Sequence, residues 1–404
     1  MRGFRDAPRQ VVTGNRIGAR AKLGSEPVNL RVRSRVPLAR RQLLSEPAKL
    51  LATIGVVGAA CALVLLLLGL RQGIAQQVSV YVDHQTTTPL LVARQGTQNF
   101  LLGRTSVLPI AVAEEIRKVP GVAHVVPVAN EYAMFNLHGR KVLTLLIGYD
   151  PALGGGPWNV AAGRAPRRLG ELALDRVLAV EHGLGIDSAL ALRGTTFRIV
   201  GLTGGTSAWM TPLAFATLDS VNALDRAPRT ATAFLVAPRR GVDLAALSST
   251  IERSVPGVDA HATTTVARND QRLWMGVFDG PLLLMVAIGA AVALLVIALA
   301  VYTSTVDRAR EYAALAAIGL SRRGLLRIVV TQATVLALGG VAAGVLLALA
   351  GGELIPRLAP KYLIVVDARS AILLALASLA MALVAAVFPA RFLSRLDPAV
   401  ALRR

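Results

Sequence analysis

The sequence is nearly free of cysteine and lacks the short motifs that mark nucleotide and metal sites. Its single cysteine, Cys61, lies in a hydrophobic run, so the polar part of the chain has no disulfide and must be held by its own core. It contains no G-x-x-x-x-G-K-[ST] phosphate loop, no H-E-x-x-H motif and no Cys/His cluster, and its five histidines share no spacing. The sequence therefore predicts no ATP hydrolysis, no catalytic residue and no metal or cofactor site in this chain.

Charged residues are absent from four long hydrophobic runs, at 50–70, 281–304, 328–350 and 371–390. Each run is long enough to cross a hydrocarbon core, which takes about 20 apolar residues. Ionisable residues inside the bilayer usually mark an ion pathway, so their absence counts against an ion-coupled carrier. The runs predict an α-helical membrane protein with four transmembrane helices, one followed by three, and a large domain at 71–280.

The net charge of +20 is concentrated in particular segments. Residues 1–49 carry 12 basic and 3 acidic side chains, the loop 305–327 carries 5 and 2, and the tail 391–404 carries 4 and 1. Residues 71–280 are nearly balanced, with 20 basic and 16 acidic, as is the short loop 351–370. The positive-inside rule then places both termini in the cytoplasm and 71–280 outside the membrane. Attraction to membrane lipids accounts for the charge, and no basic cluster in a folded domain indicates nucleic acid.

The N-terminal segment divides into three parts. Residues 1–33 are rich in Arg and Gly and predict a disordered basic tail. Residues 34–49 alternate leucine with Arg and Lys, which fits either an amphipathic helix on the inner surface or a charged stop before the anchor. The run at 50–70 is a retained anchor, because its basic leader of nearly fifty residues is too long for a signal peptide.

The large domain contains a weak internal repeat, at about 85–150 and 226–270. Each unit has the order strand, helix, Val-Pro-Gly-Val, strand, and two such split βαβ units commonly share one sheet. The residues between them, about 155–225, predict an inserted lobe, and the whole predicts a two-lobed α+β domain. The expected elements are strands at 88–95 and 230–237, helices at 109–119, 171–182 and 242–254, and hairpins at 131–137 with 141–149 and 189–193 with 196–202.

The loop 305–327 is the most informative local segment. Its first half is polar and rich in alanine, which favours a helix continuing from the second run into water. Gly319 is expected to end that helix, and Ser321 to cap the next one. A short helix with a slim alanine face suits docking into a groove on a partner, although an ordinary positive-inside loop would carry the same charges.

The string RAREYAALAAIG from Arg308 to Gly319 resembles the signature of FtsX/MacB-type ABC transporter permeases, a group that includes MacB-, LolC-, LolE- and DevC-like proteins. Ser321-Arg322-Arg323, the Pro389-Ala390-Arg391 ending and GELAL at 170–174 agree with it. The resemblance covers about 35–404 and implies contact with a separate ABC ATP-binding subunit, which would bind ATP and Mg²⁺. The residues it assigns to this contact are Arg308, Arg310, Glu311, Tyr312, Leu315, Ala317, Gly319, Ser321 and Arg322.

The resemblance implies a permease that works as a homodimer, or as a heterodimer with a paralogous permease. ATP-driven motion would reach the extracytoplasmic domain and export or extract an amphiphilic, peptide or lipid-type substrate. The alternative is an FtsX-like regulator that transports nothing and activates an extracellular cell-wall hydrolase, a partner outside the cytoplasm. Two G-x-x-x-G pairs, Gly340 with Gly344 and Gly69 with Gly73, predict close helix packing, including packing across a dimer.

Overall fold

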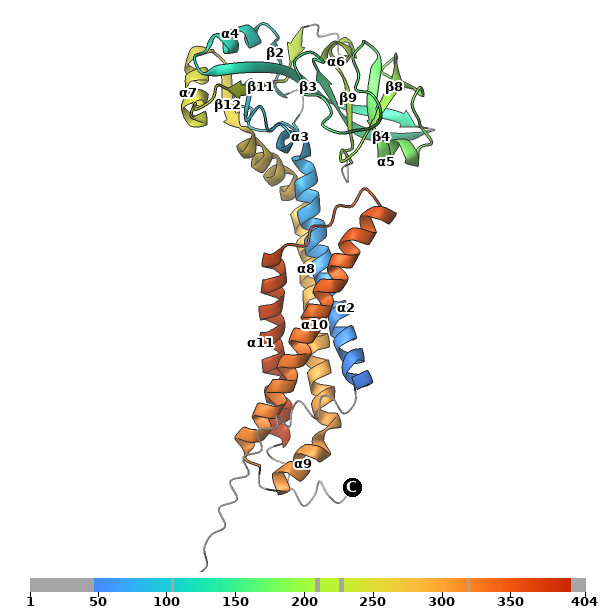
Figure 1. The fold of residues 1–404 in the computed structure, drawn as a ribbon, viewed down its shortest axis with the longest axis vertical. Coiled ribbons are helices and arrows are strands. Elements are labelled where there is room, and N and C mark those ends of the chain that lie inside the picture. The colour runs from blue at the N-terminus through green and yellow to red at the C-terminus, as the bar shows by residue number, and fades with distance from the viewer. Residues whose placement is uncertain are drawn as a thin grey trace, which may run out of the picture.

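The computed structural model describes residues 47–102, 105–137, 139–207, 211–224, 229–318 and 320–393. Within these residues, four helices are long and apolar enough to cross a membrane. Figure 1 shows them as an elongated bundle with the α+β domain at one end and the short helix α9 (Ala309–Ala317) at the other. The predicted fold class is confirmed. The four helices are α2 (Pro47–Val78), α8 (Thr263–Asp307), α10 (Arg322–Leu358) and α11 (Ala368–Leu393).

Two of these helices continue far beyond their apolar runs. Helix α2 continues to Val78 and α8 begins at Thr263, so 71–78 and 263–280 form a helical stalk and not part of the α+β fold. The sequence placed the domain boundary where apolar side chains end, but the Arg and Gln residues that follow are also good helix formers. The predicted tail 1–33, the predicted segment 34–49 as far as Glu46, and the predicted tail 391–404 from Ser394 onward lie outside the described residues.

The bundle is built around α2. This helix packs against both α8 and α10, and α11 closes the group by packing on α10 and α8. Cys61 and Leu65 of α2 are buried with Ile297 of α8 and Ala337 of α10 in one apolar cluster. The helices therefore form one packed unit, because each contributes side chains to a shared core.

Ion pairs join α2 to α8 at both ends of this core. Lys49 Nζ lies 2.5 Å from Asp307 Oδ2 near the α9 end. Arg71 donates two hydrogen bonds to the Asp279 carboxylate near the domain, at 2.6 and 2.8 Å. The helix between Lys49 and Arg71 rises about 33 Å at 1.5 Å per residue, close to the ~30 Å thickness of a hydrocarbon core. The two pairs therefore lie near the two faces of the membrane.

The two strand–helix–strand units interlock in one half of the domain. The strand order there is β12-β1-β11-β3, with every pair antiparallel, so each unit inserts one strand between the two strands of the other. Leu90 and Val92 pack under α4 and α7, whereas Leu91 and Ala93 pack toward the stalk. Both faces of the sheet are therefore buried. The elements are β1 (Leu90–Arg94), α4 (Val112–Lys118), β3 (Val122–Leu137), β11 (Ala233–Pro238), α7 (Leu244–Ser254) and β12 (Val258–Ala262).

The second half continues the same sheet. The second part of β3, Val128–Leu137, pairs with β4, and the order then runs β4-β9-β6-β8-β5, while β7 pairs with the first part of β8 on the same edge as β5. The two lobes thus share one sheet, and both predicted hairpins form. The elements are β4 (Arg140–Tyr149), β5 (Val160–Gly163), β6 (Glu171–Asp175), α5 (Arg176–Glu181), β7 (Ala189–Leu192), β8 (Thr195–Thr203), β9 (Leu213–Thr217) and α6 (Leu218–Leu224). Short elements complete the domain: α3 (Val80–Asp83), β2 (Leu108–Pro109) and β10 (Thr230–Ala231).

The helix predicted at 171–182 is wrong in its first half. Residues 171–175 form strand β6, which lies between β8 and β9 and is buried at every position. A strand covered on both faces has no polar alternation, so its apolar residues imitate helical spacing. The helix begins only after Asp175, whose Oδ1 accepts a hydrogen bond from Leu178 N at 3.0 Å.

Candidate functional site

Helix α9 lies at the end of the bundle farthest from the α+β domain (Figure 1). It follows α8 after a single residue, Arg308, which is half-buried. Its first turn contains Glu311, which suits the positive end of the helix dipole. The helix therefore extends directly from the longest membrane helix, as the sequence predicts for the first half of the loop.

One face of α9 is fixed to the bundle. Tyr312 is only 1% exposed, and its hydroxyl donates a 2.5 Å hydrogen bond to Oε1 of Gln332 on α10. Burial raises the pKa of Tyr312, so its hydroxyl stays protonated and can donate. Leu315, one turn on, packs against the apolar core of the bundle. Tyr312 and Leu315 were predicted to contact a partner; the structure instead has them holding α9 in place.

The opposite face of α9 is open to solvent. Arg310, Glu311, Ala314, Ala317 and Ile318 are exposed, at positions that recur with helical spacing. Ile318 is 85% exposed, the largest value among the exposed large apolar residues of the described chain. Of the predicted contact residues, this face brings together Arg310, Glu311 and Ala317. The sequence reasoning missed Ala314 and Ile318, whose signal was their spacing from Glu311.

The connection from α9 to α10 is short and capped. Ser321 accepts a hydrogen bond at its Oγ from Gly324 N, which makes it the N-cap of α10, as predicted. Leu320 N donates to Leu315 O at 3.0 Å and so closes the end of α9. Gly319 lies outside the described residues, and the side chain of Arg322 is not described. Ser321 therefore shapes the site through the backbone.

Gly340 and Gly344 lie where α10 crosses α2. A Cβ at Gly340 would lie 2.2 Å from Val57 Cγ1, and one at Gly344 would lie 2.7 Å from Cys61 Cβ and 2.9 Å from Gly58 O. Gly58 completes the crossing from α2, since its own Cβ would lie 2.8 Å from Ala343 Cβ. The close packing predicted for this pair occurs within one chain. Packing across a dimer, also predicted for this pair, stays a prediction; on the face that the glycines present, the contact is with α2.

The second pair, Gly69 and Gly73, packs against a loop and not against a helix. The segment between α10 and α11 runs across α2 there, with Val365 N donating to Gly69 O at 3.0 Å. A Cβ at Gly73 would lie 1.7 Å from the carbonyl oxygen of Leu363. Lys361, in the same loop, forms a 2.7 Å ion pair with Glu181 at the end of α5. The loop therefore connects the bundle, the stalk and the second half of the α+β domain.

Comparison with known proteins gives matches along most of the chain. The model of the MacB-like periplasmic core domain matches residues 50–254, and that of the FtsX-like permease C-terminal region matches residues 283–398. Relatives in Mycobacterium tuberculosis and Mycobacterium bovis, named uncharacterized ABC transporter permeases, are 26% identical over 90% of this chain and 98% of theirs.

Two solved structures resemble part of the chain. The periplasmic region of MacB from Actinobacillus actinomycetemcomitans is 11% identical with a TM-score of 0.35, covering 46% of this chain and 94% of that one. The extracellular domain of the noncanonic ABC-type transporter YknZ from Gram-positive bacteria is 10% identical with a TM-score of 0.34, covering 43% and 98%.

Proposed function

Because the chain belongs to the MacB/FtsX-type family of ABC transporter permeases, we propose that it transmits the work of a separate ATPase to its extracytoplasmic domain. The ATPase would bind ATP and Mg²⁺ and dock on the exposed face of α9, at the cytoplasmic surface of a bacterial cell membrane. Both termini would then be cytoplasmic. The output is export or extraction of an amphiphilic, peptide or lipid-type substrate at the outer surface.

The observation that supports this mechanism best is the continuity of α8. This helix is 45 residues long and begins at Thr263, directly after the last residue of β12. At 1.5 Å per residue it extends about 68 Å, from α9 to the edge of the sheet. A displacement at α9 would therefore reach the sheet through one continuous helix with no intervening loop, although Pro281 removes one backbone hydrogen bond inside it.

The chemistry of the α9 face suits a groove on the partner. Ala314 and Ala317 allow close approach, while Glu311 and Ile318 supply a charge and an exposed apolar side chain. A helix that docks in a groove contributes anchors from one face, spaced three or four residues apart. Tyr312 lies on the reverse side, so its bond to Gln332 would pass a push on α9 into α10 as well as α8.

A second copy of this chain would pack on the outer face of α8. From Leu284 on, exposed apolar side chains recur there in steps of three and four, and Val277 lies one heptad before Leu284, which is the spacing of a helix–helix seam. Val277 is 68% exposed and lies on the domain side of Asp279, beyond the apolar run, where lipid would not cover it. The seam residues are Val277, Leu284, Ile288, Val292, Leu295, Leu299, Tyr302 and Val306.

The coupling proposal is tested by capture of the ATPase on tagged, membrane-extracted permease. We expect Glu311→Lys and Ile318→Asp each to reduce the retained ATPase at least ten-fold, because losing a central interface contact costs about 2 kcal/mol or more. Glu353→Lys makes the same charge change at the other end of α10, where the side chain is 82% exposed, and should retain the ATPase fully.

Equal capture by all three variants and the wild type would contradict docking on α9. Activity is tested with an ATPase variant that binds ATP without hydrolysing it. If export or extraction continued at the wild-type rate with that variant, ATP-driven motion of the domain would be the wrong mechanism.

A further inference from the structure

A fully buried carboxylate lies where the stalk meets the α+β domain. Asp270, on the stalk part of α8, has no exposed surface. It lies nine residues before Asp279, about 14 Å along the helix at 1.5 Å per residue, and therefore on the domain side of the membrane. Isolated carboxylates are rarely buried, because removing their charge from water is costly.

Asp270 holds the loop between β1 and β2 against the stalk. Its Oδ2 accepts a hydrogen bond from Phe100 N and its Oδ1 accepts one from Leu101 N, both at 3.2 Å. The side chain of Asn99 also hydrogen-bonds to this carboxylate. The loop, residues 95–102, is therefore attached to α8 at three successive residues.

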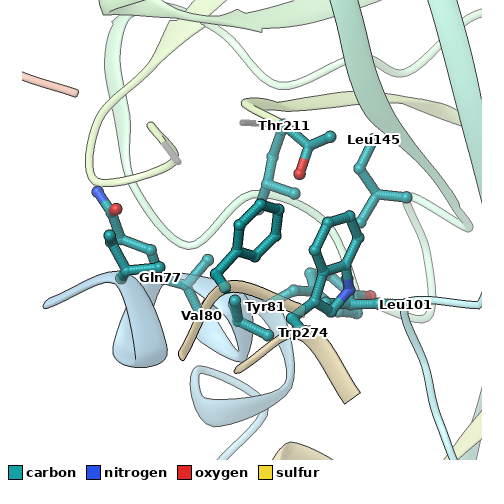
Figure 2. Close-up of a pocket in the computed structure, with 11 residues that line it drawn as sticks. Gln77, Val80, Tyr81, Leu101, Leu145, Thr211 and Trp274 are labelled. Atoms are coloured by element: carbon teal, nitrogen blue, oxygen red, sulfur yellow. The ribbon is translucent and has the colours of Figure 1, made fainter. Parts of the chain in front are cut away.

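The same loop is fixed to the domain on its other side. Asn130 of β3 donates a hydrogen bond from Nδ2 to Phe100 O. The Phe100 ring stacks on Tyr81 of α3, with centroids 4.9 Å apart. Leu101, Tyr81 and Trp274 line one small apolar pocket beside this contact (Figure 2). The loop therefore links α8 to the sheet, and the link depends on what Asp270 accepts.

The charge of Asp270 has no cation beside it in the described part of the chain. The groups that hydrogen-bond to it are neutral. Arg268 and Arg272, its neighbours on α8, donate to acceptors on that helix. Arg71 of α2 is paired with Asp279. A buried carboxylate in such surroundings favours its neutral form.

The elements around Asp270 add other titratable groups. Burial and the Asp270 charge raise the pKa of Tyr132 to about 12, which places the two groups within electrostatic reach. The Tyr132 hydroxyl is buried with no hydrogen-bond partner among the described residues, so it does not stabilise the carboxylate. Arg94, the charged residue of β1, lies on the opposite face, because Leu91 and Ala93 face the stalk. The other titratable groups on this side are Tyr81 and Asp83 of α3 and Asp259 and His261 of β12.

These surroundings change the proton affinity of Asp270. Burial raises its pKa from the ordinary 3.8 to about 6, and the hydrogen bonds from Leu101 N, Asn99 and Phe100 N lower it only in part. When the loop leaves α8, the carboxylate is solvated and its pKa returns toward the ordinary value. The attached state therefore binds the proton more tightly. The stabilisation that the proton gives is complete below about pH 3.8 and is lost as the pH rises through about 6.

We propose that Asp270 is a proton-controlled joint: a proton taken up from the extracytoplasmic medium fastens the 95–102 loop to α8, and loss of that proton loosens the loop. The neutral carboxyl group fastens it because burying it does not require a charge to be removed from water. The joint lies at the domain end of α8, so external acidity would set how firmly the domain follows this helix. That consequence rests on the proposed function, whereas proton binding itself needs no ATPase.

The test is hydrogen–deuterium exchange of the full-length permease in phospholipid nanodiscs, without the ATPase, at about pH 5 and about pH 7.5. The amides of Phe100 and Leu101 donate to Asp270, so they exchange when the joint opens. Each rate is divided by that of an unstructured peptide of the same sequence, which removes the direct effect of pH on amide exchange.

We expect the corrected wild-type rate to be about ten-fold higher at pH 7.5 than at pH 5. This is the change in opened population for a group that titrates near 6 when attached and near 3.8 when solvated. Asp270→Asn, which keeps the shape of the side chain but cannot ionise, should exchange at the same corrected rate at both pH values.

Two control variants keep Asp270 and should keep the ten-fold change. Asp259→Asn removes the carboxylate that accepts a 2.7 Å hydrogen bond from Gly96 N at the other end of the loop. His261→Gln removes the histidine of the same sheet face, a residue type that titrates in this pH range.

A wild-type rate that does not change with pH overturns the proposal, whether or not the variants fold. An equal pH dependence in Asp270→Asn, or its loss in either control, would assign the effect to another group and overturn it as well. All these measurements omit the ATPase, so failure of this proposal is distinguishable from failure of the coupling proposal.

Discussion

The crossing of α2 and α10 allows a quantitative prediction for Gly344→Ala. The added methyl would lie 2.7 Å from Cys61 Cβ and 2.9 Å from Gly58 O, whereas carbon atoms prefer separations of about 3.5–4.0 Å. One neighbour is backbone, so the helices must separate by roughly 1 Å. Overpacking of this kind costs about 1–3 kcal/mol, and the backbone contact favours the upper half of that range.

The matched control is Gly55→Ala, three residues before Gly58 on α2, where an added Cβ meets nothing within 4 Å. Both substitutions gain about 1 kcal/mol of helix propensity. The two variants should therefore differ in stability by about 2–3 kcal/mol, which is about a 30- to 150-fold difference in the population of the opened bundle.

The assay is labelling of Cys61, the only cysteine of the chain, which is fully buried against this crossing. A thiol-reactive dye can reach it only when the helices separate, so the labelling rate follows the opened population. Gly344→Ala should label about 30-fold faster than Gly55→Ala or more. The labelling rate should not depend on protein concentration, because the crossing lies within one chain. Equal rates for the two variants, or rates that rise on dilution, would refute this account of the crossing.

Two further predictions concern the stalk and the domain. Val277→Cys should form a reducible dimer under mild oxidation, because symmetric copies of a seam residue approach within the ~7 Å limit of a disulfide. Arg268→Cys, on the opposite side of α8, should not form one. The reverse result would contradict the proposed seam. Hydrogen bonds from Arg164 hold the pKa of Glu171 at about 2, below its ordinary 4.5, so its stabilising effect is complete above about pH 4.5 and is lost as pH falls toward 2. Glu171→Gln should then lower the urea midpoint of unfolding at pH 7, and the midpoint of this variant should fall less than that of the wild type as the pH drops below 4.5. Glu115→Gln, on the exposed side of α4, should change neither. If the midpoints of both variants depended on pH in the same way, the Arg164–Glu171 ion pair would not stabilise the domain.

The sequence specified the parts of the fold that depend on local pattern. Uncharged runs identified the membrane helices, and Val-Pro-Gly-Val after each helix identified the repeated units of the domain. The predictions failed where tertiary contacts decide. Strand β6 lies between β8 and β9, so Leu172 and Leu174 have apolar residues on either side in the sequence. Such a continuous apolar run cannot be distinguished from the apolar spacing of a helix by local pattern alone. At α9 the sequence located the helix but not its faces, since the inward direction of Tyr312 depends on Gln332, twenty residues away on α10.

The glycine pairs show most clearly what a sequence leaves open. Small residues spaced four apart make a shallow groove on a helix, but the groove accepts any backbone that approaches it. On α2, Gly58 packs closely against α10, while Gly73 packs closely against the carbonyl group of Leu363 in an extended loop. This second contact fixes the α10–α11 loop to the stalk, and the Lys361–Glu181 pair fixes the same loop to the second half of the domain. The domain therefore cannot move relative to α2 without shifting this loop or breaking its contacts, so α10 and α11 also take part in any motion that α8 transmits.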